Sequence, residues 1–191
     1  MRVQESKFRL ERLAMAKRDQ AMRKGCILRG KPWDSTIDLR NTRRMKLIVQ
    51  RYGWPTMPMV GKRAAMAAWL LVQHADRDVA WQERCLALLG AAAEEGTIER
   101  WHWAFLTDRV RVGRGKPQIY GTQFHTNARG KAAPRPIRDR KHLDVRRRAV
   151  GLSKFGSDAR VLQTRVARGK QRPPPQAIRA AVLRSRRLRK E

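Results

Sequence analysis

The sequence predicts a mostly helical domain of about five helices with one β-hairpin, followed by a basic tail. Apolar residues recur every three to four positions through most of the first 110 residues, which is the spacing of amphipathic helices. After Pro117 they recur at every second position around a glycine-containing turn, as in a hairpin. The stretch RGKQRPPPQ (168–176) is typical of a linker. We therefore expect a domain over 5–152 with its hairpin near 117–137, and a Pro/Arg-rich tail over 153–191 that is disordered when free.

Two helices are predicted before the first strong break in the chain. The first covers residues 4–24 and stops at Gly25, because glycine is common just past the end of a helix. The second covers about 38–52, and YGWPTMPMVG (52–61) ends it with two prolines and two glycines. The apolar side of the first helix is expected to hold Leu10, Leu13, Ala14 and Ala21.

Further helices are predicted over about 63–77, 79–93 and 98–110. Asp78 either continues the first of these or is the N-cap of the second, and Thr97 is expected to cap the third. A short basic helix near 140–149 follows the hairpin.

The most informative polar residues lie at the ends of two apolar helix faces. His74 follows Ala67, Leu70 and Leu71 at helical spacing, and Asp108 follows Trp101, Ala104 and Phe105 in the same way, so both are expected to be buried. A buried carboxylate needs a cation or hydrogen-bond donors, and His74, Arg109 and Gln73 are candidate partners of Asp108. A carboxylate that orients an imidazole is a common acid–base arrangement. A purely structural pair between two helices is the competing interpretation.

The predicted strand adds amide and phenol groups to this candidate site. Alternation places Gln118, Tyr120, Thr122 and Phe124 on one face, and Gln123 and His125 on the other. Such groups supply the directed donors and acceptors that orient a small polar ligand. For Tyr120, packing in the core is the alternative to a ligand contact.

Several separate motifs occur in an order typical of one family. GWP (53–55), AAWLLVQHAD (67–76), LTDRV (106–110) and GKPQIYGTQF (115–124) resemble the uncharacterised bacterial domain of unknown function 6624, over about residues 10–152. DQAMR (19–23) and NTRRMK (41–46) belong to the same resemblance. It implies one shared polar site but no reaction. The implied site residues are His74, Asp76, Asp108, Arg109, Gln118, Tyr120 and Gln123.

The first functional hypothesis is therefore a pocket that binds a small polar ligand or catalyses a hydrolase- or transferase-like reaction on it. We expect three catalytic candidates, His74, Asp108 and Tyr120, and five ligand-binding candidates, Gln73, Asp76, Arg109, Gln118 and Gln123. A purely protein-binding module, anchored by Trp33, Trp54, Trp81, Trp101 and Trp103, is a further hypothesis, although core packing explains most tryptophans.

The charge distribution supports a different hypothesis, binding of DNA, RNA or another polyanion. The net charge is +10 over residues 1–52, +2 over 53–125 and +17 over 126–191, within a total of +29. Such a field attracts phosphate backbones, although it is also compatible with a role in solubility alone. In this alternative, that of a nucleic-acid- or ribonucleoprotein-associated protein, His74 and Asp108 are structural. The expected contact residues are Arg146, Arg147, Arg148, Arg184, Arg186 and Arg187.

Other classes are not favoured by the sequence. The longest apolar run, Ala64–Val72, is nine residues, against roughly 20 needed to span a bilayer. The N-terminal segment has no apolar core of a signal peptide, so a cytoplasmic location is expected. Two cysteines make no disulfide framework, and the four histidines lack the spacing of a zinc site. Asp76 and Asp78 with Asp108 could surround Mg²⁺, but two residues at a spacing of two on a helix point in different directions. No metal is favoured, and any cofactor is unknown.

Overall fold

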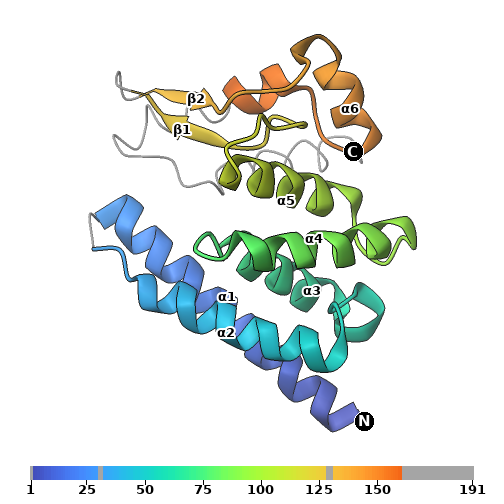
Figure 1. Ribbon diagram of the computed structural model, residues 1–191. Coiled ribbons are helices and arrows are strands. Elements are labelled where there is room, and N and C mark those ends of the chain that lie inside the picture. Colours follow the sequence, from blue (N-terminus) through green and yellow to red (C-terminus); the bar gives the residue numbers. More distant parts are fainter. Residues whose placement is uncertain (1, 30–31, 128–130, 161–191) are drawn as a thin grey trace, which may run out of the picture.

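The structure is a computed structural model that describes residues 2–29, 32–127 and 131–160 (Figure 1). Within these residues it is mostly helical with one antiparallel hairpin, so the predicted fold class is confirmed. None of the described helices is both long enough and apolar enough to cross a membrane. The predicted linker at 168–176 and the basic segment after it lie outside the described residues. The elements are α1 (Arg2–Arg29), α2 (Ser35–Tyr52), α3 (Met57–Gln73), α4 (Val79–Glu94), α5 (Arg100–Gly113), β1 (Phe124–Thr126), β2 (Ala132–Pro134), the 3₁₀ turn η1 (Arg140–His142) and α6 (Leu143–Ala149).

The elements are stacked in layers in the order of the chain (Figure 1). Helices α1 and α2 lie side by side and both contact α3, while α4 contacts α5. The hairpin and α6 lie beyond α5, at the far end from α1 and α2. Helix α3 is therefore central, and the polar residues at its C-terminal end are placed between the layers.

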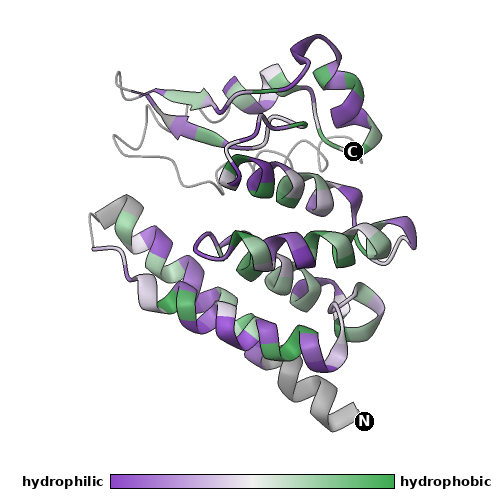
Figure 2. Ribbon diagram, viewed as in Figure 1, coloured by the Kyte–Doolittle hydropathy of each residue, from purple (hydrophilic) through white to green (hydrophobic). Residues whose placement is uncertain are grey.

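The core follows from the composition of the central helices. Helices α3 and α4 are rich in apolar residues (Figure 2), and almost every α3 residue from position 64 onward is buried. The ring of Trp69 makes edge contacts with Trp101, at 5.1 Å between ring centroids, and with Phe105, at 6.0 Å. Burying these large rings supplies much of the apolar area removed from water on folding. Trp33 is the tryptophan that remains half exposed, at 50%.

Helix α1 differs from the prediction in its length and in its buried face. It continues through Gly25 to Arg29 instead of stopping. Ala14 and Ala21, expected on the apolar side, are exposed, whereas Met15 and Ala16 are buried. The buried stripe also contains charged residues that find partners inside the protein, so the distribution of apolar residues alone does not identify it.

The ends of α3, α4 and α5 show which of the predicted helix boundaries are correct. Asp78 is the N-cap of α4, because its carboxylate accepts a hydrogen bond from the Trp81 N–H at 3.0 Å. Helix α3 begins earlier than predicted and bends at Gly61, whose φ of 75° and ψ of 156° favour glycine. It also ends at Gln73, not at residue 77. Thr97 does not cap α5: its hydroxyl donates to the Ala92 carbonyl, and Glu99 is the N-cap residue.

The hairpin is present but shorter than its predicted range. Strands β1 and β2 pair antiparallel, with Phe124 opposite Pro134. Residues 119–123 form an irregular loop instead of a strand, so the predicted alternation of side chains across this segment is wrong. The physical reason is that several N–H groups of the loop bind a buried carboxylate rather than a neighbouring strand.

Candidate functional site

His74 lies where the chain leaves the C-terminal end of α3, and it is only 4% exposed. Its Nδ1 is 2.9 Å from Oδ1 of Asp19, a fully buried residue of α1. The prediction that His74 is buried is confirmed, but the predicted pairing with Asp108 is wrong. The carboxylate comes from the DQAMR motif, which lies 55 residues before the histidine.

Arg23 extends this pair toward the surface. Its Nε donates to Oδ1 of Asp19 at 2.9 Å, and its Nη2 donates to Oδ1 of Asp38 at 2.5 Å. The side chain of Asp38, on α2, is 15% exposed and so lies at the edge of the buried region. We call these four residues, His74, Asp19, Arg23 and Asp38, the inner cluster. Three helices contribute to it.

Burial sets the protonation of the inner cluster. Loss of hydration lowers the pKa of His74 to about 4, although the hydrogen bond with Asp19 partly offsets this effect. Burial also opposes the charge of Asp19, but the hydrogen bonds and charges of its neighbours outweigh it and hold the pKa of Asp19 below its usual value. The imidazole is therefore neutral at pH 7 and donates its Nδ1 hydrogen to an ionised carboxylate.

The pKa of Asp38 is shifted in the opposite direction from that of His74. Burial raises its pKa to about 6, and the negative charges of Asp19 and Asp76 add to this rise, while Arg23 opposes it. A carboxyl group with this pKa is partly protonated near neutral pH and can donate a proton. The inner cluster therefore holds a neutral imidazole and a carboxylic acid whose pKa values are displaced in opposite directions.

A second group of polar residues begins at Asp76, two residues after His74, and reaches the surface. Nε of Arg109, on α5, donates to Oδ1 of Asp76 at 2.6 Å, and its Nη2 donates to the other oxygen of the same carboxylate. Nη1 of Arg109 donates to the side-chain oxygen of Gln123 at 3.2 Å. The side chain of Asp76 is 56% exposed, so this bridge opens to solvent. The positive charge of Arg109 contributes to the lowered pKa of His74, after burial and the charge of Arg23.

Two buried amide groups near the inner cluster have no hydrogen-bond partner for their nitrogen within the described residues. They are Nδ2 of Asn41, one helical turn after Asp38 on α2, and Nε2 of Gln73, which directly precedes His74. Asn41 is 8% exposed and Gln73 is 5% exposed. Buried donors are almost always satisfied in folded proteins, so these two are candidate contacts for an acceptor atom of a ligand or for water.

Asp108 has a different environment from the one expected. Its carboxylate is fully buried and accepts hydrogen bonds from the backbone N–H groups of Ile119, Tyr120 and Thr122, at 2.6, 3.0 and 2.9 Å, and from the Thr122 hydroxyl. Burial raises the pKa of Asp108, and these donors oppose the rise. Asp108 thus holds the loop of residues 119–123, and it does not orient His74.

Gln118 and Tyr120 also have structural contacts in this loop. The amide nitrogen of Gln118 donates to the carbonyls of Gln123 and Arg135, at 3.0 and 2.8 Å. The ring of Tyr120 packs edge-on against Trp103, with 6.0 Å between centroids. Of the residues expected at one site, Asp76, Arg109 and Gln123 are joined by hydrogen bonds, whereas His74, with Gln73 directly before it, pairs with Asp19. Asp108, Gln118 and Tyr120 support the loop that carries Gln123.

The three carboxylates that were candidates for binding Mg²⁺ each have a different partner. Asp76 binds Arg109, Asp78 caps α4 and pairs with Lys46 at 2.5 Å, and Asp108 binds the loop. In the described part of the chain, no group of three or more His, Cys, Asp or Glu side chains is arranged to hold a metal ion.

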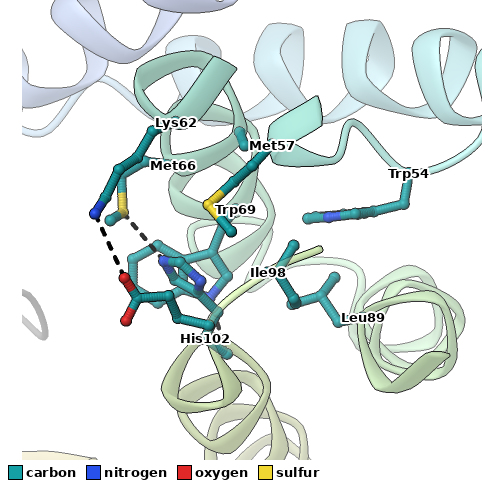
Figure 3. A pocket seen from close by; sticks show the side chains of 10 residues that line it. Trp54, Met57, Lys62, Met66, Trp69, Leu89, Ile98 and His102 are labelled. Carbon is teal, nitrogen blue, oxygen red and sulfur yellow. Dashed lines mark hydrogen bonds and ion pairs between the residues drawn. The ribbon is translucent and has the colours of Figure 1, made fainter. Parts of the chain in front are cut away.

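A small hollow lies between α3, α5 and the segment before α3 (Figure 3). Nε2 of His102 is 3.3 Å from Sδ of Met66 at this hollow, and Lys62 pairs with Glu99 at 3.5 Å. Its volume of about 10 Å³ holds about one water molecule, far below the 300–1,000 Å³ typical of ligand pockets. None of the inner-cluster residues lines it, so we do not regard it as the site.

The predicted nucleic-acid contacts of α6 are only partly on the surface. Arg147 is fully buried: it donates to the carbonyls of Tyr120 and Ser153, at 2.6 and 2.7 Å, and pairs with Asp158. The expectation that Arg147 contacts phosphate is therefore wrong, because its guanidinium is used inside the protein. Arg146 is partly buried and binds the Ile119 carbonyl, whereas Arg148 is exposed. Arg184, Arg186 and Arg187 lie outside the described residues.

Sequence reasoning missed Asp19, Arg23, Asp38 and Asn41 as members of the site. A usable signal existed in α1, where Arg12, Asp19 and Arg23 share one face with Met15 at spacings of three, four or seven residues. Charged residues that repeat on a buried face need internal partners, and this requirement points to a buried polar site.

The model of a family described as "Family of unknown function (DUF6624)" matches residues 6–169. No curated protein and no solved structure matches the chain.

Proposed function

The chain belongs to the DUF6624 family of unknown function, and we propose that it binds a small polar ligand at the inner cluster and performs acid–base chemistry on it. Hydrolysis and group transfer are the reaction classes that such chemistry serves most often. The observation that carries the proposal is the buried hydrogen bond of 2.9 Å between His74 and Asp19, in a region that also contains partly exposed carboxyl groups.

His74 has the role of a general base. Asp19 accepts the Nδ1 hydrogen, which fixes the tautomer and leaves the lone pair on Nε2. A carboxylate in this position also stabilises the imidazolium that forms when the base takes up a proton. The positive charges of Arg23 and Arg109 lower the pKa of His74, so an anionic or acceptor-rich ligand near them makes the imidazole more basic.

Asp38 has the complementary role of a general acid. Its pKa of about 6 leaves a protonated fraction near neutral pH, and its side chain lies at the edge of the buried region. Two titratable groups whose environments displace their pKa values in opposite directions are a recurrent feature of acid–base sites. The amide nitrogens of Asn41 and Gln73, which have no partner among the described residues, would bind acceptor atoms of the ligand.

Ligand binding and turnover test this proposal. The full chain is dialysed against a defined mixture of polar metabolites, and enrichment is measured by mass spectrometry; a set of nitrophenyl phosphates, esters and glycosides reports hydrolysis. We expect His74→Gln and Asp19→Asn each to lower enrichment or turnover at least tenfold.

A matched control removes a carboxylate elsewhere on the surface. Glu83→Gln breaks an exposed pair with Arg114 and should behave as the unmodified protein. Circular dichroism and the melting temperature establish that each variant is folded. Unchanged enrichment and turnover in folded His74→Gln and Asp19→Asn, or neither enrichment nor turnover in the unmodified protein, would contradict the proposal.

A further inference from the structure

The outward side of α2 is basic along its whole length. Residues Asn41, Met45, Ile48 and Val49 are buried against the core. The opposite side presents exposed side chains at helical spacing, and none of the exposed residues of α2 is acidic. These exposed residues include Leu39, Arg40, Arg43, Lys46, Leu47, Gln50 and Arg51.

Helix α1 continues this surface. Over residues 11–26, its exposed residues are either basic, as Lys17, Arg18 and Lys24 are, or small, as Ala14 and Ala21 are. Both helices contact α3 and each other, and they lie side by side (Figure 1), so we infer that their exposed sides belong to one surface. We call this surface the outer face of α1 and α2.

Six cations of the outer face form no ion pair in the described part of the chain. They differ from Lys46, which pairs with Asp78, and from Arg44, which pairs with Glu11 at the edge of the same surface. A row of unpaired cations without carboxylates repels itself and attracts an anionic partner. The six are Lys17, Arg18, Lys24, Arg40, Arg43 and Arg51.

An exposed indole stands at the end of this face. Trp33, just before α2, is 50% exposed, and the guanidinium of Arg23 lies 4.6 Å from the centre of its ring. Arg23 is held by Asp19 and Asp38, so it supports the ring in a defined position. An aromatic ring that is supported on one side and exposed on the other is suited to stacking against a planar group.

We propose that the outer face of α1 and α2 binds single-stranded nucleic acid, with the cations on the phosphate backbone and Trp33 stacked on an unpaired base. Cations along a surface that ends in an exposed aromatic ring are the usual combination for single strands. A duplex keeps its bases stacked, so it leaves the ring unused. This proposal does not depend on catalysis at the inner cluster.

Two other partners fit the surface less well. Insertion into a membrane interface needs a broad apolar side on the helix, whereas the exposed apolar side chains Leu39 and Leu47 are separated by Arg43. Protein interfaces are depleted of lysine at their centres, and this face carries Lys17, Lys24 and Lys46.

The first test uses fluorescence anisotropy of the full chain with a labelled 20-nucleotide oligouridylate. Binding is measured between 50 and 200 mM salt for the unmodified protein, Arg40→Gln/Arg43→Gln and the control Arg84→Gln/Arg100→Gln. The control removes the same charge from exposed positions on α4 and α5. Each phosphate contact contributes about 0.7 to the slope of log affinity against log salt, so the first variant should reduce the slope by about 1.4. The control should leave the slope unchanged.

The second test isolates stacking. Trp33→Ala should weaken oligouridylate binding about tenfold, which is within the range for one stacked base, and Trp33→Phe should retain most of the affinity. Binding of heparin, a polyanion without bases, should be the same for both variants. A labelled DNA single strand, a duplex of the same length and polyglutamate serve as further probes, and we expect the single strands to bind most tightly.

Several results would overturn the proposal. The first is that the unmodified protein does not bind oligouridylate at 50 mM salt. The second is that the two double variants change the salt dependence equally. The third is that Trp33→Ala weakens the binding of heparin and of oligouridylate to the same extent. Tighter binding of polyglutamate or duplex than of either single strand would also overturn it. Melting temperatures of all variants establish that changes in binding do not reflect unfolding.

Discussion

At the scale of single residues, burial decides which groups of this protein carry charge. His74 and Asp38 are both kept closer to their neutral forms than they would be in water, whereas Asp19 stays ionised because Arg23 and His74 are its neighbours. The same partners that stabilise Asp19 also fix the position of the imidazole. The chemistry available to the site therefore depends on helix contacts and not on His74 alone.

The lowered pKa of His74 predicts a specific dependence of stability on pH. In the unfolded chain the imidazole takes up a proton near pH 6.5, but in the folded protein it does so only near pH 4. The folded state therefore binds fewer protons in this interval, and stability is lost as the pH falls from about 6.5 to about 4, by about 3 kcal/mol. Above pH 6.5 this group makes no pH-dependent contribution.

This prediction is measured by urea denaturation at several pH values for the unmodified protein and His74→Gln. The variant should lose less stability over that interval, and the NMR titration of the imidazole should give a midpoint near 4. A midpoint near 6.5 would show that the imidazole is accessible to water and not held in its neutral form.

At the scale of elements, a loop and not a strand supports the site. The segment 119–123 is fixed by the carboxylate of Asp108 and by Gly121, whose φ is +65°. A Cβ atom added at Gly121 would lie 3.0 Å from the ring of Phe155, so both the backbone angle and the close contact require glycine there. This loop carries Gln123, which accepts a hydrogen bond from Arg109, the partner of Asp76.

Replacing Asp108 by Asn tests whether the residue is structural. The amide has one acceptor oxygen in place of two, and its NH₂ group would face N–H donors of the loop. We expect a loss of about 2–4 kcal/mol in the free energy of unfolding, since charged hydrogen bonds to buried donors are broken. Hydrogen exchange at the amides of Tyr120 and Thr122 should become faster. Unchanged stability with lost ligand binding would instead assign Asp108 to the ligand site.

At the scale of the whole molecule, one buried arginine joins the last described segment to the rest. Arg147 on α6 binds the loop at the Tyr120 carbonyl and also binds Ser153 and Asp158, in the segment after α6. Ser153 donates to the same Asp158 carboxylate at 2.6 Å. These contacts connect three parts of the chain through a single guanidinium, so Arg147 is positioned to couple their unfolding.

Arg147→Ala should destabilise the protein by about 3–5 kcal/mol, because it leaves the Asp158 carboxylate buried without its cation. Arg148→Ala is the matched control, since that neighbouring arginine is exposed, and it should change stability by less than about 0.5 kcal/mol. Denaturant unfolding of both variants measures the difference. Equal stability of the two variants would show that the buried contacts of Arg147 are not important for folding.

Local sequence patterns determined a large part of this structure. Helical spacing and the change of spacing after Pro117 predicted the mostly helical class with one hairpin. Of the two roles that the sequence left open for Asp78, the structure has the N-cap of α4. The burial of His74 and Asp108 also followed from spacing, because a helix repeats its faces over a few residues. These features depend on neighbours within one or two helical turns.

Only the tertiary structure decided how the buried polar groups are paired. His74 could have paired with Asp108 by its place in the sequence, but the packing of α1 against α3 brings Asp19 to it. The same holds for Arg147. Its place in a run of arginines predicts a surface cation, but in the fold it binds Asp158 and the Tyr120 carbonyl of the loop. Periodicity shows which side of a helix is buried, whereas the partner of a buried charge depends on the relative positions of helices that are distant in sequence. For this reason the sequence predicted that His74 and Asp108 are buried, and only the fold showed which groups bind them.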